Sequence, residues 1–141
     1  MREILFRGKD VKSNNIWRKG SFVLEADPKH GDGYCICWAV DMGGEYPIMR
    51  RARVLPETVS QYIGFVDRYR DKIFEGDILK YVIPDPPHAD SVGYAEVIWD
   101  NGWKLQFKGH EPEETDQEDL SKYTEIVGNI WDTPELLGVK R

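Results

Sequence analysis

The sequence predicts an all-β protein with short helical turns, and three observations support this fold class. Apolar and polar residues alternate over many short segments, as they do in half-buried strands. Clusters of Gly, Pro, Asn and Asp separate these segments, and such clusters are typical of turns. Aromatic residues make up 12% of the 141 residues, and aromatic side chains favour strands and supply large core contacts.

The first four predicted strands are residues 3–7, 16–25, 34–40 and 49–55. Ile4 and Phe6 share one face of the first strand, because side chains alternate along a strand. A loop rich in Gly, Pro and Asp at 27–33 separates the second strand from the third, which Gly43 and Gly44 end. This half of the chain is therefore predicted to form a β unit.

The later predicted strands are residues 62–66, 78–83, 92–99, 103–108 and 123–131. Asn101-Gly102 between alternating segments is a strong hairpin signal, because both residues tolerate positive φ in a type I′ turn. Three prolines predict an exposed loop at 84–90. Pro56 and Pro134, the latter after Thr133 as N-cap, each suit the first position of a helical turn.

The chain is predicted to contain two subdomains. Residues 1–56 form an N-terminal β subdomain, and residues 57–141 form a C-terminal SH3-like, partly open small barrel. The barrel is suggested by five strands in under sixty residues after Gly76. Between the last two strands, residues 111–119 are strongly acidic, and we expect a solvated loop or a short frayed helix there.

Charge and missing targeting segments predict the compartment. The formal net charge is −6, which disfavours non-specific nucleic-acid binding by overall charge. The charged N-terminus lacks the apolar core of a signal peptide, and no stretch approaches the roughly 20 apolar residues of a membrane span. We therefore expect a cytoplasmic protein that does not associate with a membrane.

No catalytic, metal or cofactor site is predicted. Cys35 and Cys37 have the wrong spacing for a zinc pair, even with His30, His88 or His110, and we expect them to be reduced. Neither a nucleophile elbow nor a phosphate-binding glycine loop occurs. The Glu-Gly-Asp block at 75–77 could hold paired carboxylates for acid–base chemistry, but a structural turn is the favoured interpretation.

Two basic clusters are candidate contacts for nucleic acid or for a protein partner. Small β-barrels bind nucleic-acid strands through aromatic side chains interleaved with cations. Trp99, Trp103 and Phe107 could form a stacking platform, but Trp103, Leu105 and Phe107 share one face of a strand, which favours a core role. The candidate contact residues are Arg50, Arg51, Arg53, Arg68, Tyr69 and Arg70.

Two blocks, Tyr62-Ile63-Gly64-Phe65-Val66-Asp67 and Ile73-Phe74-Glu75-Gly76-Asp77-Ile78, resemble the signature of the YopX family of phage and prophage proteins. Agreement extends to the opening residues 2–7, the strand Val97-Ile98-Trp99, and the closing segment 125–137. One departure is the charged tip at 68–72, where the family often has Asn-Gly. The matching residues expected to be structural are Gly64, Glu75, Gly76, Asp77, Gly128 and Asn129.

The resemblance implies a mainly β protein that is encoded in a phage or prophage and acts inside a bacterium, without catalytic residues to carry over. The first hypothesis is a non-catalytic accessory protein for binding or assembly, with a phage or host protein as partner. The alternatives are a nucleic-acid-binding barrel in phage replication or regulation, and an unrecognised hydrolase. We also expect a homo-oligomer, because short β units leave sheet edges that subunit packing can cover.

Overall fold

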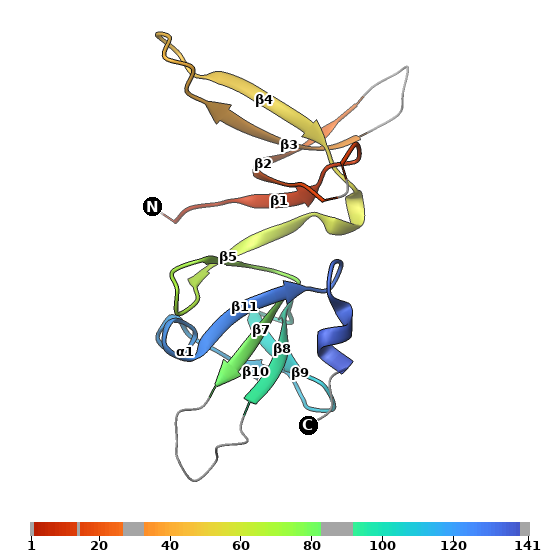
Figure 1. The fold of residues 1–141 in the computed structure, drawn as a ribbon, viewed down its shortest axis with the longest axis vertical. Helices are drawn as coiled ribbons and strands as arrows, with labels where there is room; N and C mark the ends of the chain where they lie inside the picture. Colours follow the sequence, from red (N-terminus) through yellow and green to blue (C-terminus); the bar gives the residue numbers. More distant parts are fainter. Residues whose placement is uncertain (1, 14, 27–32, 83–91, 139–141) are drawn as a thin grey trace. The chain divides into compact units, whose positions relative to one another are not determined.

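The computed structural model describes residues 2–13, 15–26, 33–82 and 92–138, and strands predominate in these residues. The predicted all-β class is therefore confirmed. The chain divides into two compact units, Met1–Gln61 and Tyr62–Arg141, whose folds can each be followed in Figure 1. The division into subdomains 1–56 and 57–141, which the sequence suggested, stays a prediction. No helix in the described ranges is long and apolar enough to cross a membrane.

Unit 1 is an antiparallel sheet with a single helical turn before β5, its last strand in the chain. The sheet order is β4-β3-β2-β1-β5, so β4 is an edge strand. The 3₁₀ turn η1 (Pro56–Thr58) has proline at its start, as predicted, and leads into β5. The strands are β1 (Phe6–Lys9), β2 (Trp17–Glu25), β3 (Gly33–Val40), β4 (Ile48–Arg53) and β5 (Ser60–Val66), whose last five residues belong to unit 2.

The core of unit 1 lies where β3 passes the chain that follows β4. Ile36 is 0% exposed and Val54 is 2% exposed. The Phe22 ring lies 5.8 Å from that of Phe6, and ring contacts at these separations are favourable. The first strand was predicted at 3–7 but occupies Phe6–Lys9, because its register is set by pairing with Trp17 to Gly20 of β2 and not by its own alternation.

Unit 2 is built on a five-stranded antiparallel sheet in the order β10-β9-β8-β7-β11. Among the described residues its two edge strands do not pair, so the sheet is not a closed barrel. Strand β5 continues into this unit and pairs with β6. The elements are β6 (Lys72–Phe74), β7 (Asp77–Val82), β8 (Val92–Trp99), β9 (Trp103–Phe107), β10 (Glu113–Glu114), α1 (Gln117–Tyr123), β11 (Thr124–Asn129) and η3 (Pro134–Gly138).

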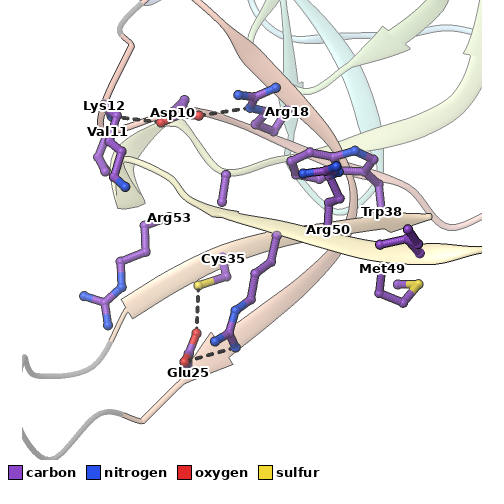
Figure 2. A pocket seen from close by; sticks show the side chains of 13 residues that line it. Asp10, Val11, Lys12, Arg18, Glu25, Cys35, Trp38, Met49, Arg50 and Arg53 are labelled. Carbon is purple, nitrogen blue, oxygen red and sulfur yellow. Dashed lines mark hydrogen bonds and ion pairs between the residues drawn. The ribbon is translucent and has the colours of Figure 1, made fainter. Parts of the chain in front are cut away.

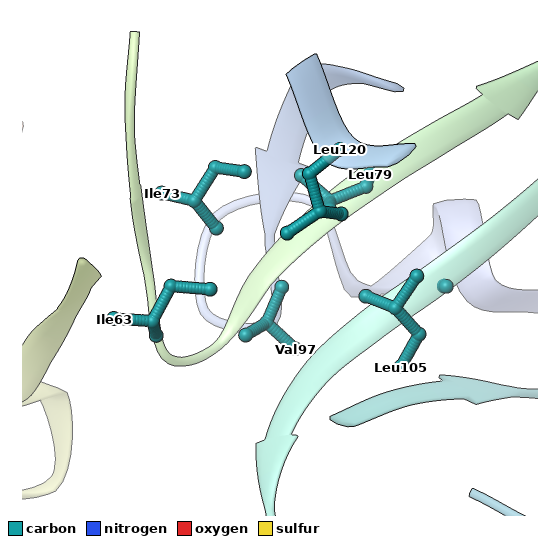
Figure 3. Close-up of a cluster of buried hydrophobic side chains, with 7 residues drawn as sticks. Ile63, Ile73, Leu79, Val97, Leu105 and Leu120 are labelled. Carbon is teal, nitrogen blue, oxygen red and sulfur yellow. The ribbon is translucent and has the colours of Figure 1, made fainter. Parts of the chain in front are cut away.

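The core of unit 2 is a cluster of aliphatic side chains from six elements (Figure 3). Trp103 and Phe107 pack against it, and Leu105 is part of it, so the predicted core role of these three residues is confirmed. Trp99 is different because it is 60% exposed. The buried members are Ile63, Ile73, Leu79, Ala95, Val97, Leu105 and Leu120.

The acidic segment forms the strand β10 and the start of a helix, and a short helix was one of the two structures expected there. Its C-terminal part enters α1, for which Asp116 is the N-cap and accepts a hydrogen bond from the Asp119 N–H at 2.8 Å. Leu120 is fully buried and anchors this helix, and helical stability in proteins comes mainly from such packing. The helix ends at Tyr123, so the last strand begins at Thr124 and not at 123 as predicted.

The predicted hairpin at Asn101-Gly102 is confirmed, with a different loop. Asn101 has φ +55° and Gly102 has φ +136°, so both residues adopt the positive φ that the sequence predicted. Strand pairing ends at Trp99 and Trp103, which leaves three residues between them and not the two of a type I′ turn. The loop predicted at 84–90, with His88, and most of the loop at 27–33, with His30, lie outside the described residues.

Candidate binding groove beside strand β4

Asp67, at the end of the first signature block, organises the charged tip between β5 and β6. It is 1% exposed. One carboxylate oxygen accepts hydrogen bonds from the N–H groups of Tyr69 and Asp71, both at 2.9 Å. The other oxygen accepts from the Ile126 N–H on β11 at 3.1 Å. A buried carboxylate with three backbone donors holds a fold together, because leaving those donors unpaired would be costly.

The Glu75-Gly76-Asp77 block forms the turn between β6 and β7. Gly76 has φ +84°, and a Cβ at this position would lie 2.5 Å from the Trp131 ring. The Asp77 carboxylate is buried and accepts a hydrogen bond from the Phe74 N–H at 2.8 Å. Gly64 also has a positive φ, +91°. Gly76 and Asp77 therefore shape the turn between β6 and β7, whereas Gly64 lies within β5, where the pairing with β6 shifts register.

Gly128 and Asn129 are the last two residues of β11, and both contact the turn that follows this strand. The Asn129 side-chain oxygen accepts hydrogen bonds from the N–H groups of Trp131 and Asp132, at 3.0 and 2.8 Å. Thr133 directly precedes η3, as predicted, and its carbonyl accepts the Leu136 N–H at 3.1 Å. Its hydroxyl exchanges hydrogen bonds with the Asn129 backbone. A Cβ on Gly128 would collide with the Thr133 side chain. These signature residues also have structural roles.

Two half-buried carboxyl groups stand out in unit 2. Burial raises the pKa of Glu75 above its ordinary value. The pKa of Glu96 is also raised, first by burial and then by the negative charge of Glu75. In the described ranges, no three His, Cys, Asp or Glu side chains gather into a group that could hold a metal ion.

The candidate binding site is in unit 1, in a groove along the edge strand β4 (Figure 2). The groove has a volume of about 970 Å³. All six residues of β4 line it, together with the segment after β1 and side chains from β2 and β3. The lining residues are Asp10, Val11, Lys12, Arg18, Glu25, Cys35, Trp38, Ile48, Met49, Arg50, Arg51, Ala52 and Arg53.

Strand register brings the arginines of β4 to opposite faces of the sheet. Trp38 on β3 is paired with Arg50, whereas Cys35 is paired with Arg53. Because side chains alternate along a strand, Arg51 lies on the same face as Arg53 and opposite to Arg50. Figure 2 shows Arg50 beside Trp38. The predicted cluster Arg50, Arg51 and Arg53 therefore surrounds the exposed edge of β4 with positive charge.

Cations outnumber carboxylates in this groove. Its lining has five Lys or Arg side chains and two carboxylates, Asp10 and Glu25. Asp10 pairs with Arg18 at 3.0 Å, and Glu25 pairs with Arg51 at 3.1 Å. The Arg18 guanidinium also lies 5.2 Å from the centre of the Trp38 ring. The lining therefore has three more cationic than acidic side chains.

The two carboxylates are held by nearby donors. A hydrogen bond from the Lys12 N–H lowers the pKa of Asp10, and the Arg18 guanidinium contributes in the same direction. The Cys35 thiol donates to Glu25 at 3.4 Å. Burial, followed by this bond, raises the pKa of Cys35, so it remains a protonated thiol near neutral pH. Both Cys35 and Cys37 are free cysteines.

The backbone of β4 also faces the groove. In an antiparallel ladder, successive residues alternately bond to the neighbouring strand and point away from it. The Val54 N–H bonds back to Tyr34 at 2.9 Å, whereas the Arg53 carbonyl points outward and accepts from the Val11 N–H at 3.0 Å. Met49 and Arg51 precede Arg53 by four and two residues, so their backbone groups point outward as those of Arg53 do. Their N–H and C=O groups therefore lie on the open side of β4, as in any uncovered edge strand.

The second predicted basic cluster lies in the other unit, at the tip between β5 and β6. Tyr69 is 59% exposed, and the Arg68 guanidinium lies 5.0 Å from the centre of its ring. Arg70 has φ +67°, a backbone conformation that glycine adopts more readily than arginine. It lies at the charged tip, where the family that the sequence resembles often has Asn-Gly. The two clusters are thus separate features of the chain, and only the β4 cluster lines the groove.

Residues 5–138 match the YopX protein family, a span of nearly the whole chain. The chain belongs to the YopX family. Among solved structures, EF1440 from Enterococcus faecalis matches with a TM-score of 0.58 at 21% sequence identity, covering 97% of this chain and 99% of that chain. This likeness shows a shared fold. Among curated proteins, none matches the chain.

Sequence reasoning about this YopX protein found the three arginines of β4 but missed the rest of the groove. Lys12, Arg18 and Trp38 are distant in sequence, and they meet β4 through strand pairing and through the segment that follows β1. The register of β3 and β4 was the available signal, because pairing across the Gly43-Gly44 turn places Trp38 opposite Arg50.

Proposed function

We propose that this YopX protein is a phage or prophage accessory protein that acts inside a bacterial host as a non-catalytic binding module. Its binding surface is the groove beside β4. The observation that carries this proposal is the combination of an open strand edge with an excess of positive charge in one groove. The occupant that fits both features is an extended, acidic segment of a protein partner.

Strand addition explains how the groove would hold such a segment. The outward N–H and C=O groups of Met49 and Arg51 would bond to the partner backbone, which supplies affinity without requiring a particular sequence. Arg50 and Arg53 would attract carboxylates on opposite faces of the added strand, which supplies orientation. The edge is accessible to a partner, since four of the six residues of β4 are exposed.

The roles of the signature carboxylates support a binding function. Asp67 and Asp77 are buried and accept backbone hydrogen bonds, so they are engaged in holding turns. A carboxylate that acts as general acid or base must reach a substrate proton. The hydrolase alternative therefore receives no support from these two residues.

Two substitutions at Arg51 distinguish the contribution of backbone pairing to binding from that of side-chain charge. Arg51→Pro removes the outward N–H, and proline is tolerated in an edge strand on that side. Arg51→Gln retains the N–H and removes the charge together with the ion pair to Glu25. The probe is a fluorescein-labelled peptide of alternating Thr and Glu, with a Thr and Lys peptide as its charge control, and binding is followed by fluorescence anisotropy.

We expect the Thr and Glu peptide to bind the wild type, and the Thr and Lys peptide not to bind. Arg51→Pro should abolish binding, whereas Arg51→Gln should weaken it about tenfold, which corresponds to about 1.4 kcal/mol. Circular dichroism and thermal unfolding verify that both variants fold. Equal binding by wild type and the folded proline variant would exclude strand addition. Absence of acidic-peptide binding to the wild type would overturn the proposed function.

Nucleic-acid binding is a second candidate, favoured by the stacking of Arg18 on Trp38 within the cationic groove. Such a site would hold a single strand through stacking and phosphate contacts. A 20-nucleotide single-stranded DNA serves as the probe in the same assay. Tighter binding of this DNA than of the acidic peptide, with affinity falling steeply as salt increases, would favour this candidate over the first.

A further inference from the structure

We infer that the acidic edge strand β10 of a second copy of this chain occupies the groove beside β4, so that copies associate head to tail. The inference rests on the proposed function, because it uses the same groove and the same open edge. It adds the identity of the partner. The two edges that would meet belong to different units, β4 to unit 1 and β10 to unit 2.

The acidic edge has the properties that the groove requires. Glu113 and Glu114 form β10, whose partner on one side is β9, and the sheet order leaves the other side unpaired among the described residues. Both glutamates are exposed. The segment from 111 to 119 contains no Lys or Arg. Its exposed acidic residues are Glu111, Glu113, Glu114, Asp116, Glu118 and Asp119.

Charge disfavours the simplest alternative, a symmetric pair of β4 strands. Antiparallel pairing of β4 with its own copy would bring Arg50, Arg51 and Arg53 of one strand close to the same residues of the other. Like charges placed directly opposite each other across two strands are destabilising. Opposite charges on β4 and β10 instead favour a contact between unlike surfaces.

Exposed apolar side chains near both edges supply area for such a contact. Ile48 and Met49 on β4 are 47% and 65% exposed. Trp99 on β8 is 60% exposed and is paired with Trp103 on β9. Trp103 is next in sequence to Lys104, the residue that is paired with Glu114 of β10. Burial of these groups would provide most of the affinity, whereas the charges would set orientation and partner choice.

A contact between unlike surfaces leaves one β4 edge and one β10 edge free in every dimer. Further copies can therefore add until a ring closes or a filament grows. A symmetric dimer would stop at two copies. The inference thus predicts species larger than a dimer, whose proportion rises with protein concentration.

Sedimentation velocity on the full chain, with complementary charge reversals, tests this inference. The basic-edge variant is Arg50→Glu with Arg53→Glu, and the acidic-edge variant is Glu113→Lys with Glu114→Lys. The basic-edge variant spares Arg51 because that residue pairs with Glu25. The control variant, Arg68→Glu with Arg70→Glu, reverses the basic tip of unit 2 and leaves both edges unchanged. Circular dichroism verifies the fold of each variant.

We expect the wild type and the control to associate equally, and each edge variant alone to associate at least tenfold more weakly. An equimolar mixture of the two edge variants should recover association, because each reversed edge then meets a complementary one. A wild type that remains a single 16.4 kDa species, or a mixture that stays monomeric, would overturn the inference. If the acidic peptide still bound that monomer, the proposed function would stand and only the second copy would be excluded.

Discussion

Gly76 combines two constraints at a single residue, a positive φ of +84° and a close approach to Trp131. Gly109 has nearly the same φ, +81°, but nothing within 4 Å of the position where a Cβ would lie. The pair therefore separates backbone strain from steric collision. We predict that Gly109→Ala lowers the free energy of unfolding by about 1–2 kcal/mol, the cost of a left-handed backbone for an L-residue.

Gly76→Ala should lower it by about 3–5 kcal/mol, because the collision with Trp131 adds to that backbone cost. Urea unfolding of both variants at neutral pH measures the two values. Equal losses for Gly76→Ala and Gly109→Ala would show that Trp131 moves aside without cost, and that the glycine is required for its φ alone.

Glu96 gives a prediction about pH. Its pKa in the folded protein is raised by burial and by Glu75, so the folded state disfavours the charged form. This destabilisation is fully present above the folded pKa and is relieved as the pH falls through it, since the folded state then binds the extra proton. We predict that Glu96→Gln raises the free energy of unfolding at pH 7, and that the difference disappears below about pH 4.

Thermal unfolding across this pH range checks the prediction, with Glu113→Gln as the control. Glu113 is exposed on β10, so its substitution should change the unfolding temperature little at any pH. An unaltered or lower stability of Glu96→Gln at pH 7 would contradict the destabilising role that burial gives to this carboxylate.

At the scale of the element, the β8–β9 hairpin depends on the backbone of its loop. Asn101 and Gly102 both have positive φ, which β-branched residues disfavour. We predict that Asn101→Val with Gly102→Val destabilises unit 2 by about 2–4 kcal/mol, at about 1–2 kcal/mol for each left-handed position. Urea unfolding measures the loss. Asp100→Ala in the same loop is the control, and a similar loss there would refute the φ argument.

Elements defined by long alternation were located well from the sequence. Strand β2 was predicted to within one residue at its start, and β8 with both ends correct. Short elements were placed less well, because their ends depend on partners. Strand β1 follows its pairing with β2, and the start of β11 is set by the last turn of α1.

At the scale of the whole molecule, each unit has a core of its own. Ile36 is fully buried in unit 1, and Leu79 is fully buried in the core cluster of unit 2. We predict that Ile36→Ala, with a cavity cost of about 2–5 kcal/mol, speeds hydrogen exchange in residues 1–61 while unit 2 keeps its protection. Leu79→Ala should have the converse effect.

Hydrogen exchange followed by mass spectrometry resolves the two ranges, because local and global opening have different free energies. Equal acceleration in both units after either substitution would show that the chain unfolds as one cooperative unit. That result would also contradict the subdomain organisation that was predicted from the sequence.

The sequence by itself determined the fold class, the main strands and the hairpin at 101–102. All of these depend on local chemistry: side-chain alternation, turn residues, and glycines at positive φ. It also located the three arginines of β4. Only the tertiary structure decided that β4 is an edge strand, and that Lys12, Arg18 and Trp38 join its arginines around one groove. The physical reason is that sheet order depends on pairing between segments that are distant in the chain, and the alternation within one strand does not say which segment lies beside it.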